Sequence, residues 1–476
     1  MGSTTTLYSS YICKFIGGIR LRYETIQELM DKAREAEGKT FGEIDTTGRI
    51  KNVRSKGSLG HIIEESHFGY PINSDARPDF EELGIELKVT PFKKNKNGTY
   101  SSKERLVLNM IDYHSEHRYS FETSSFLSKA TSMLIMLYQY EPEIPIDDYR
   151  IYKAFLNEFS EEDLAVMRQD WETIVTKIKN GEAHLISEAD TMYLSACTKG
   201  ANGSIVRTQP FSDEPAKPRA FSLKASYMSG LVRKYLTPEL LESIANQGEL
   251  NEMSIEELLE TRLSPHYGKT LIDLCEETKV PYNPRNKAMI PHVMAKLLGV
   301  QKTDLSGIEE FAKANIKFKT VAREPNGKIR EHMSFGKVDF ENLCQSDWED
   351  SDLYDTFAEQ KYLFLEFQYD EEYVPKKKRI PRFVGIRLWN MPLETIDGEL
   401  YEMWSEARKV VREGVELIPM KNRVKNNLPG PKFNRVAHVR SKGADGDDKV
   451  RLPDGQWITK QAFWLDRNYI QQILDA

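Results

Sequence analysis

The chain repeats its own sequence. GKTFGEI at 38–44 recurs as GKTLIDL at 268–274, and the segment 56–88 aligns with 287–319 at a constant offset of 231. Three further pairs follow in the same order: Lys129 with Lys361, KGANG at 199–203 with KGADG at 442–446, and AFSLKASY at 220–227 with AFWLDRNY at 462–469. Because this period is far too long for a solenoid, the ordered pairs predict two tandem copies of one domain.

The two copies predict the domain boundaries. We expect a first domain over residues 1–235, a second over 262–476 and a helical linker over 236–261. The linker carries leucine and isoleucine residues at helical spacing and no Gly/Ser-rich tether. We therefore expect the two domains to pack together.

The first copy mixes helical and strand patterns. Apolar residues at 26–33 and again from Ser58 onward recur at helical spacing, whereas GIELKVTPF at 84–92 alternates strictly and MLIMLYQY at 133–140 is continuously apolar. The predicted fold class is mixed α/β: two tandem copies of a domain with a central mixed sheet flanked by helices.

Composition excludes several classes of protein. No stretch approaches 18 uninterrupted apolar residues, which excludes a transmembrane helix, so we expect no membrane partner. The four cysteines are far apart and form no CxxC pair, which indicates a reducing compartment without a disulfide framework. The N-terminus lacks the pattern of a signal peptide, so we expect a cytoplasmic protein.

Charge and motifs narrow the class further. The net charge of −7 argues against nucleic-acid binding, but phosphate contacts depend on the local field of one face rather than on the sum. The chain contains no P-loop, GxGxxG or GxSxG motif, so we expect no nucleotide cofactor. The spacing of HxxExxH at 61–67 spreads the two histidines around a helix, which argues against a zinc protease.

The segment PDFEELGIELK at 78–88 carries the most informative charges. Glu86 and Lys88 are two residues apart on the predicted strand, so their side chains share one face, and Asp79 lies in the loop just before. Carboxylates placed close together repel, and a divalent cation with a preference for oxygen, Mg²⁺ or Mn²⁺, relieves that repulsion. This pattern predicts metal-assisted phosphodiester hydrolysis, and the alternative is an edge strand with a solvated Glu/Lys face.

These residues carry a resemblance to a known family. The P-D-x6-E-x-K pattern resembles the PD-(D/E)xK nuclease superfamily of restriction-endonuclease-like folds, and the string from Lys56 to Phe92 resembles the MutH and Sau-type GATC-specific endonucleases. The resemblance extends through FETSSFLSK at 121–129, TKGANG at 198–203 and AFSLK at 220–224. Because Sau-type restriction enzymes also carry a second, degenerate copy, the resemblance covers essentially the whole chain.

The resemblance implies roles for individual residues. Asp79 and Glu86 would bind Mg²⁺, Lys88 would be the active-site lysine, and Glu64 would be an additional catalytic carboxylate that binds the metal directly or through water, or holds Lys88. Two lysines, Lys56 and Lys129, match residues near the scissile phosphate. In the loop that would read the major groove, Lys199 and Asn202 suit guanine and adenine, although KGANG is also typical of a plain turn.

One departure from the family pattern concerns methylation. The mismatch-repair nickase carries an aromatic residue at the place of Ser222, where it senses adenine methylation. Serine at this position casts doubt on methylation sensing and fits a restriction enzyme better. The second copy has Trp464 at the equivalent place.

The second copy is predicted to be inactive. At the offset of 231, Glu310 replaces Asp79, Lys317 replaces Glu86, Lys319 replaces Lys88 and Ala295 replaces Glu64. A site with two lysines and one carboxylate repels a divalent cation. The copy nevertheless keeps recognition-like cations at Lys361, Arg440 and Lys442, with basic runs at 376–379 and 421–425, which indicate either a solubilising surface or a DNA-binding effector domain.

The sequence leaves three functions to be compared. The first is a type II restriction endonuclease of a restriction-modification system, making Mg²⁺-dependent double-strand cuts at GATC. Its N-terminal domain would be catalytic and its C-terminal domain an allosteric effector, and two chains would associate on DNA. The second is a MutH-like nicking enzyme of mismatch repair, and the third is a catalytically silent DNA-binding protein.

Overall fold

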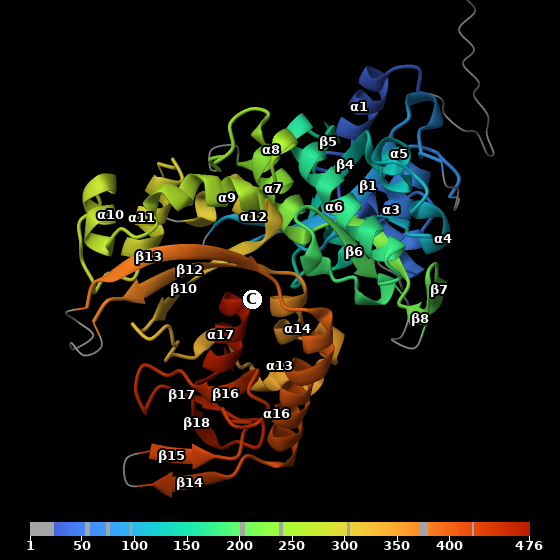
Figure 1. Ribbon diagram of the computed structural model, residues 1–476. Coiled ribbons are helices and arrows are strands. Elements are labelled where there is room, and N and C mark those ends of the chain that lie inside the picture. Colours follow the sequence, from blue (N-terminus) through green and yellow to red (C-terminus); the bar gives the residue numbers. More distant parts are fainter. Residues whose placement is uncertain are drawn as a thin grey trace, which may run out of the picture. The chain divides into compact units, whose positions relative to one another are not determined.

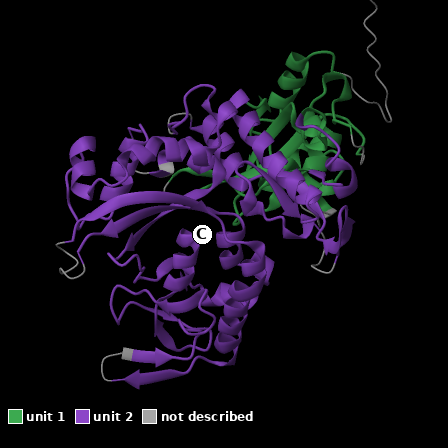
Figure 2. Ribbon diagram, in the orientation of Figure 1, with its two compact units in different colours: residues 1–108, 122–159 green, residues 109–121, 160–476 purple. Residues whose placement is uncertain are grey.

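The computed structural model describes residues 23–52, 58–72, 77–95, 98–199, 205–237, 241–301, 305–371, 379–420 and 423–476. The chain divides into two compact units, one of residues 1–108 with 122–159 and the other of residues 109–121 with 160–476 (Figure 2). This division places residues 160–235 in the same unit as the second copy. The domain boundaries expected from the repeat stay a prediction.

Helices and strands are both abundant, which confirms the mixed α/β class (Figure 1). Among the described residues, no helix is both long and apolar enough to cross a bilayer. The helices of more than one turn are α1 (Ile26–Arg34), α3 (Ser58–Ile62), α5 (Ser125–Ala130), α6 (Glu161–Lys179), α7 (Ala225–Leu236), α9 (Ile255–Leu263), α10 (Leu271–Thr278), α11 (Met289–Leu297), α12 (Glu309–Ala314), α13 (Phe340–Gln345), α14 (Asp352–Ala358), α16 (Tyr401–Glu413) and α17 (Arg467–Asp475).

The first unit contains a four-stranded sheet in the order β2-β1-β4-β5. Its central pair is parallel and its outer pairs are antiparallel, with Glu86 opposite Met133. The apolar residues of α1 and α3 predicted to face inward, apart from the exposed Ile26, belong to the buried core beside this sheet. The strands are β1 (Glu86–Lys94), β2 (Tyr100–Ser102), β4 (Met133–Gln139) and β5 (Ile151–Asn157).

The second unit holds several small sheets. The largest have the orders β10-β12-β13 and β11-β19-β16, and β6 pairs antiparallel with β9. The unit boundary falls within β3 (Leu106–Met110). The strands are β6 (Leu194–Thr198), β7 (Arg207–Gln209), β8 (Ser212–Ala216), β9 (Arg219–Leu223), β10 (Ile316–Arg323), β11 (Met333–Lys337), β12 (Lys361–Tyr369), β13 (Pro381–Trp389), β14 (Leu417–Met420), β15 (Arg423–Asn426), β16 (Ala437–Ser441), β17 (Lys449–Arg451), β18 (Trp457–Thr459) and β19 (Gln461–Leu465).

The order of strands in the second copy follows that in the first. β10 is parallel to β12, which is antiparallel to β13, as β1 is parallel to β4 and β4 antiparallel to β5. Further along, β16 pairs antiparallel with β19, as β6 pairs with β9. This is the arrangement expected of a tandem repeat.

Candidate active site

The strand β1 places one carboxylate between two ammonium groups. Glu86 is 6% exposed, and its Oε1 accepts a hydrogen bond from Lys88 Nζ at 2.9 Å. Its Oε2 accepts one from Lys129 Nζ at 3.1 Å. The contact between Glu86 and Lys88 shows that they share one face, as the strand period predicts. A solvated Glu/Lys face, the alternative for this strand, is wrong because the carboxylate is buried.

A tight loop brings Asp79 to the start of the same strand. Phe80 and Ile85 exchange backbone hydrogen bonds at 2.9 and 3.3 Å, and Gly84 between them has a left-handed backbone with φ of 66°. This conformation suits glycine because it has no Cβ. Asp79 Oδ2 then accepts a hydrogen bond from the backbone N–H of Leu87 at 2.8 Å, which fixes its carboxylate beside the strand.

Glu64 joins the two carboxylates from a neighbouring helix. It lies in a π-helical turn, Ile63–His67, that directly continues α3, and such turns are frequent at functional sites. Burial, and then the charges of Asp79 and Glu86, raise the pKa of Glu64 to about 7. Burial and the charge of Glu86 likewise raise the pKa of Asp79. The three predicted carboxylates thus lie within electrostatic reach of one another: Asp79 and Glu86 act on Glu64, and Glu86 acts on Asp79. Among the described residues they do not form a group whose ligand atoms all lie within 4.8 Å of one another.

The residues present fit a divalent cation. The cluster offers only carboxylate oxygens, which are the ligands of hard cations such as Mg²⁺ and Mn²⁺. Burial is the largest cause of the raised pKa values of Glu64 and Asp79, and repulsion by neighbouring carboxylates, which such a cation would relieve, adds to it. Glu64, Asp79 and Glu86 are the residues that would hold it.

Lys129 has a contact that the sequence did not reveal. On α5, its Nζ donates to the backbone carbonyl of Arg77 at 2.7 Å as well as to Glu86. Sequence alone predicted only that Lys129 lies near the scissile phosphate. No local spacing could have revealed this contact, because 43 residues separate Lys129 from Glu86.

Two predicted DNA-contacting residues, Lys56 and Asn202, lie outside the described residues. Lys199, directly after β6, is partly exposed, and its backbone N–H donates to Pro218 O at 2.7 Å. This bond anchors the start of the KGANG segment next to β9. Its DNA-reading role stays a prediction.

A buried acid and a buried base support β6 and β9 near Lys199. The carboxylate of Asp170 accepts hydrogen bonds from the backbone N–H groups of Met192, Tyr193 and Leu194 at 2.6 to 2.8 Å. Lys224 donates to Thr191 O at 2.6 Å, and burial lowers its pKa to about 8. No sequence signal marked Asp170, and Lys224 stood out only as the end of AFSLK.

Ser222 and Trp464 occupy equivalent strands with different environments. Ser222 on β9 is fully buried opposite Ser195, so its hydroxyl is not at the surface. Trp464 on β19 donates from Nε1 to Arg440 O at 3.2 Å, and the side chains of Arg440 and Lys442 lie over its ring. Both cations are exposed, and their DNA-contacting role stays a prediction.

The corresponding site of the second copy is built differently. Glu310 is buried and accepts hydrogen bonds from Ser243 Oγ and from the backbone N–H groups of Ile244 and Ala245. Lys319 donates to Ser334 O at 3.0 Å, and burial, with Lys442 nearby, lowers its pKa to about 8. The one acidic replacement in this copy is therefore already satisfied by linker residues.

Lys361 differs most from its expected role. It is 6% exposed, and its Nζ donates to Asp190 O and Asn390 Oδ1, both at 3.2 Å. The strand register also differs from the sequence alignment, because Lys361 opposite Ile316 takes the place of Ser132 rather than that of Lys129. In this structure the ammonium is buried within the protein, which argues against the predicted contact with DNA.

The HxxExxH segment has a structural explanation. His67 is buried, and its Nε2 lies 2.6 Å from the backbone carbonyl of Lys32, to which it donates. The π-helical turn that begins at Ile63 changes the spacing of the segment. His67 therefore serves to join this turn to α1.

The chain is similar to known DNA-processing enzymes. The family model described as DNA mismatch repair enzyme MutH matches residues 68–170, which include Asp79, Glu86, Lys88 and Lys129. The type II restriction enzyme Sau3AI of Staphylococcus aureus is 38% identical over 95% of this chain and 99% of its own length. The MutH proteins of Shewanella woodyi and Vibrio cholerae are 32% and 28% identical, each over 44% of this chain and over 92% and 96% of their own lengths.

Proposed function

Since this chain belongs to the family of the type II restriction enzyme Sau3AI, and is thus a site-specific deoxyribonuclease with a MutH-like domain, we propose that it makes Mg²⁺-dependent double-strand cuts in DNA at GATC. The observation that carries the proposal is the cluster of Glu64, Asp79 and Glu86 with Lys88 and Lys129. Phosphodiester hydrolysis assisted by a metal ion uses carboxylates that hold the cation and basic groups beside it, and this partly buried site contains three carboxylates and two lysines.

The comparisons favour restriction over mismatch repair. The similarity to the restriction enzyme extends over nearly its whole length, including a second copy, whereas the MutH proteins match less than half of this chain. A nicking enzyme needs no second copy. The substrate GATC rests on the relationship to the restriction enzyme and on the resemblance of the motifs.

The side chains of the site divide the proposed reaction among themselves. Glu86, Asp79 and Glu64 would hold a divalent cation, which when bound supplies positive charge for the developing phosphate charge and acidifies a water. Lys88 Nζ, held by Glu86 Oε1, orients the attacking water in line with the leaving 3′ oxygen. Lys129 donates to the scissile phosphate, and the product carries a 5′-phosphate.

The second copy is proposed to bind DNA without cutting it. Exposed Arg440 and Lys442 beside Trp464 offer two cations and an aromatic face, whereas Glu310, the acidic replacement for Asp79, is engaged by the linker. A DNA copy held there would activate cleavage by the N-terminal copy. Because each chain has one such carboxylate cluster in this proposal, a double-strand break requires two chains, which associate on DNA.

A plasmid digest tests the proposed function. Plasmid DNA with several GATC sites is incubated with Mg²⁺ or EDTA and with wild type or the Glu86→Ala variant. We expect discrete Mg²⁺-dependent fragments that end at GATC and that are absent with Glu86→Ala. Open circles alone would favour a nickase, and a mobility shift without any cleavage would favour a silent DNA-binding protein.

A further inference from the structure

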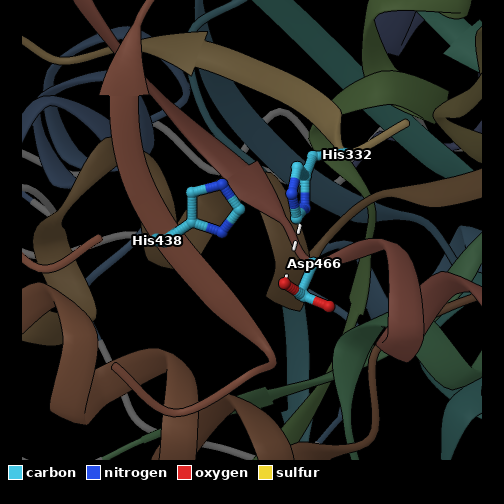
Figure 3. A group of neighbouring side chains, drawn as sticks. All are labelled: His332, His438 and Asp466. Carbon is cyan, nitrogen blue, oxygen red and sulfur yellow. Dashed lines mark ion pairs between the residues drawn. The ribbon is translucent and has the colours of Figure 1, made fainter. Parts of the chain in front are cut away.

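Two histidines and an aspartate converge in the second copy, and none of them belongs to the proposed nuclease site. His332 directly precedes β11, His438 lies on β16, and Asp466 directly follows β19 and caps α17. The three strands form one sheet in the order β11-β19-β16. Figure 3 shows the two imidazole rings beside each other, with the Asp466 carboxylate next to His332.

The spacing of the three groups suits one small ion. One potential ligand atom from each residue lies within 4.8 Å of the others. His332 Nδ1 and Asp466 Oδ2 are 3.4 Å apart, close to the separation of about 3.3 Å between ligand atoms around a tetrahedral zinc ion. The rings of His332 and His438 have centroids 4.7 Å apart at an interplanar angle of 83°.

His438 gives an independent indication of a ligand. It is 1% exposed, and within the described part of the chain neither of its ring nitrogens has a hydrogen-bond partner. Buried polar atoms are almost always satisfied, so such a group calls for an explanation. Asp466 shows a complementary division: Oδ1 accepts from the backbone N–H of Asn468 at 2.8 Å, and Oδ2 faces His332.

We propose that His332, His438 and Asp466 bind a first-row transition-metal cation of the Zn²⁺ type. Two imidazoles and one carboxylate suit Zn²⁺, Co²⁺ or Ni²⁺ better than Mg²⁺ or Ca²⁺, which prefer oxygen ligands alone. Three protein ligands leave one coordination position for water. The site is thus distinct in chemistry from the all-carboxylate cluster of the first copy.

Neighbouring groups set limits on the affinity. His332 Nδ1 accepts a hydrogen bond from the backbone N–H of Arg467 at 3.2 Å. This bond must break if Nδ1 binds the cation, and it can remain if Nε2 binds the cation instead. The charges of Arg440 and Arg467 act on these histidines and oppose a cation. We therefore expect weaker binding than at a cysteine-rich structural zinc site.

The position of the site gives it a role in the second copy. His438 is two residues before Arg440 on β16, and Asp466 is two residues after Trp464 on β19. A bound cation would join both strands to the residue before β11. It would thereby brace the surface formed by Arg440, Lys442 and Trp464, and this part of the inference rests on the proposed function of that surface.

Direct metal binding tests the site independently of nuclease activity. Full-length Glu86→Ala protein, in which the carboxylate cluster is impaired, is stripped with a chelator and titrated with Co²⁺ and then with competing Zn²⁺. We expect one equivalent per chain, with the visible absorption of Co²⁺ bound to nitrogen and oxygen ligands, and displacement by Zn²⁺. We also expect Zn²⁺ to raise the unfolding midpoint of this protein.

Matched variants decide between a site and adventitious binding. His438→Asn and Asp466→Asn, each in the Glu86→Ala background, are expected to lose at least tenfold in affinity and to lose the Zn²⁺-induced rise in midpoint. Asparagine also caps helices, so Asp466→Asn preserves the start of α17. His292→Asn on α11, outside the cluster, is the control and should bind as the parent does. Absence of stoichiometric binding by the parent, or an affinity equal to that of the parent in both cluster variants, would overturn the proposal.

Discussion

The two copies differ in charge on the corresponding strand, where Lys317 replaces Glu86. In β1 the inward pair is Glu86 and Lys88, and a loop adds Asp79, whereas β10 carries Lys317 and Lys319 at these places. β1 pairs in parallel with β4, as β10 pairs in parallel with β12. The comparison teaches that the fold and the proposed site depend on different residues: apolar residues in register maintain the sheet, and in our proposal the charges at a few positions determine whether a cation binds.

A second pair of equivalent positions also differs in charge between the two copies. Lys224 and Asp466 occupy equivalent places directly after β9 and β19, and Ser195 and His438 are equivalent on the strands that pair with them. In the first copy the buried position holds a lysine bonded to a carbonyl. In the second it holds the carboxylate of the proposed metal site. The two proposed cation sites thus lie at different places in the two copies.

The largest expected effect is on the cleavage rate, and it distinguishes Lys88 from its counterpart Lys319. Lys88→Ala should reduce the cleavage rate by about 10²–10³-fold, because the proposal makes Lys88 Nζ the group that orients the attacking water. Lys319→Ala, its counterpart on β10, should leave the chemical step unchanged. Single-turnover cleavage of a GATC duplex at saturating enzyme measures both, and equal losses would break the assignment of catalysis to the first copy.

The next effect concerns DNA binding by the second copy. Arg440→Ala with Lys442→Ala should weaken DNA binding and lower the slope of log K against log salt by about 1 to 2, because each cation neutralises one phosphate. Fluorescence anisotropy at several salt concentrations measures this. Lys361→Met is the informative control, since its buried ammonium should contribute nothing to the salt slope; a slope lowered by this variant instead would mean that Lys361 reaches the DNA.

The pH dependence of activation by Mg²⁺ sharpens the description of the first copy. Since the pKa of Glu64 is about 7 without metal, its proton must leave before it binds a cation. The apparent affinity for Mg²⁺ should therefore fall about tenfold per pH unit below pH 7 and level off above it. Mg²⁺ titrations of cleavage between pH 6 and 8 test this, and Glu64→Gln should flatten the dependence.

The smallest effect is on stability. A carboxyl group whose pKa is higher in the folded than in the unfolded state stabilises the folded protein while the group is protonated. This contribution is fully present below the pKa of the unfolded state and is lost as the pH rises through the folded-state pKa of about 7. Glu64→Gln should therefore stabilise the metal-free protein at pH 8, by about 1–2 kcal/mol after allowing for partial exposure of the side chain. Urea unfolding at pH 8 and pH 5 checks the sign: the gain should be present at pH 8 and smaller at pH 5.

The sequence by itself determined much of the first copy. Strict alternation in 84–92 placed Glu86 and Lys88 on one face, and the apolar run from Met133 became the buried β4. The class, the family and the substitutions of the second copy were likewise readable. These features depend on short-range periodicity and on aligned motifs, both of which are properties of the linear chain.

The tertiary structure decided what lies between distant segments. In the folded chain Lys129 contacts Glu86, and Glu310 accepts hydrogen bonds from the linker residues Ser243 to Ala245. Lys361 is buried, where it donates to Asp190 and Asn390. The tertiary structure also assembled His332, His438 and Asp466 from three segments up to 134 residues apart. Spacing along the chain carries no information about such pairings, because strand order and loop paths, rather than local periodicity, set which side chains meet.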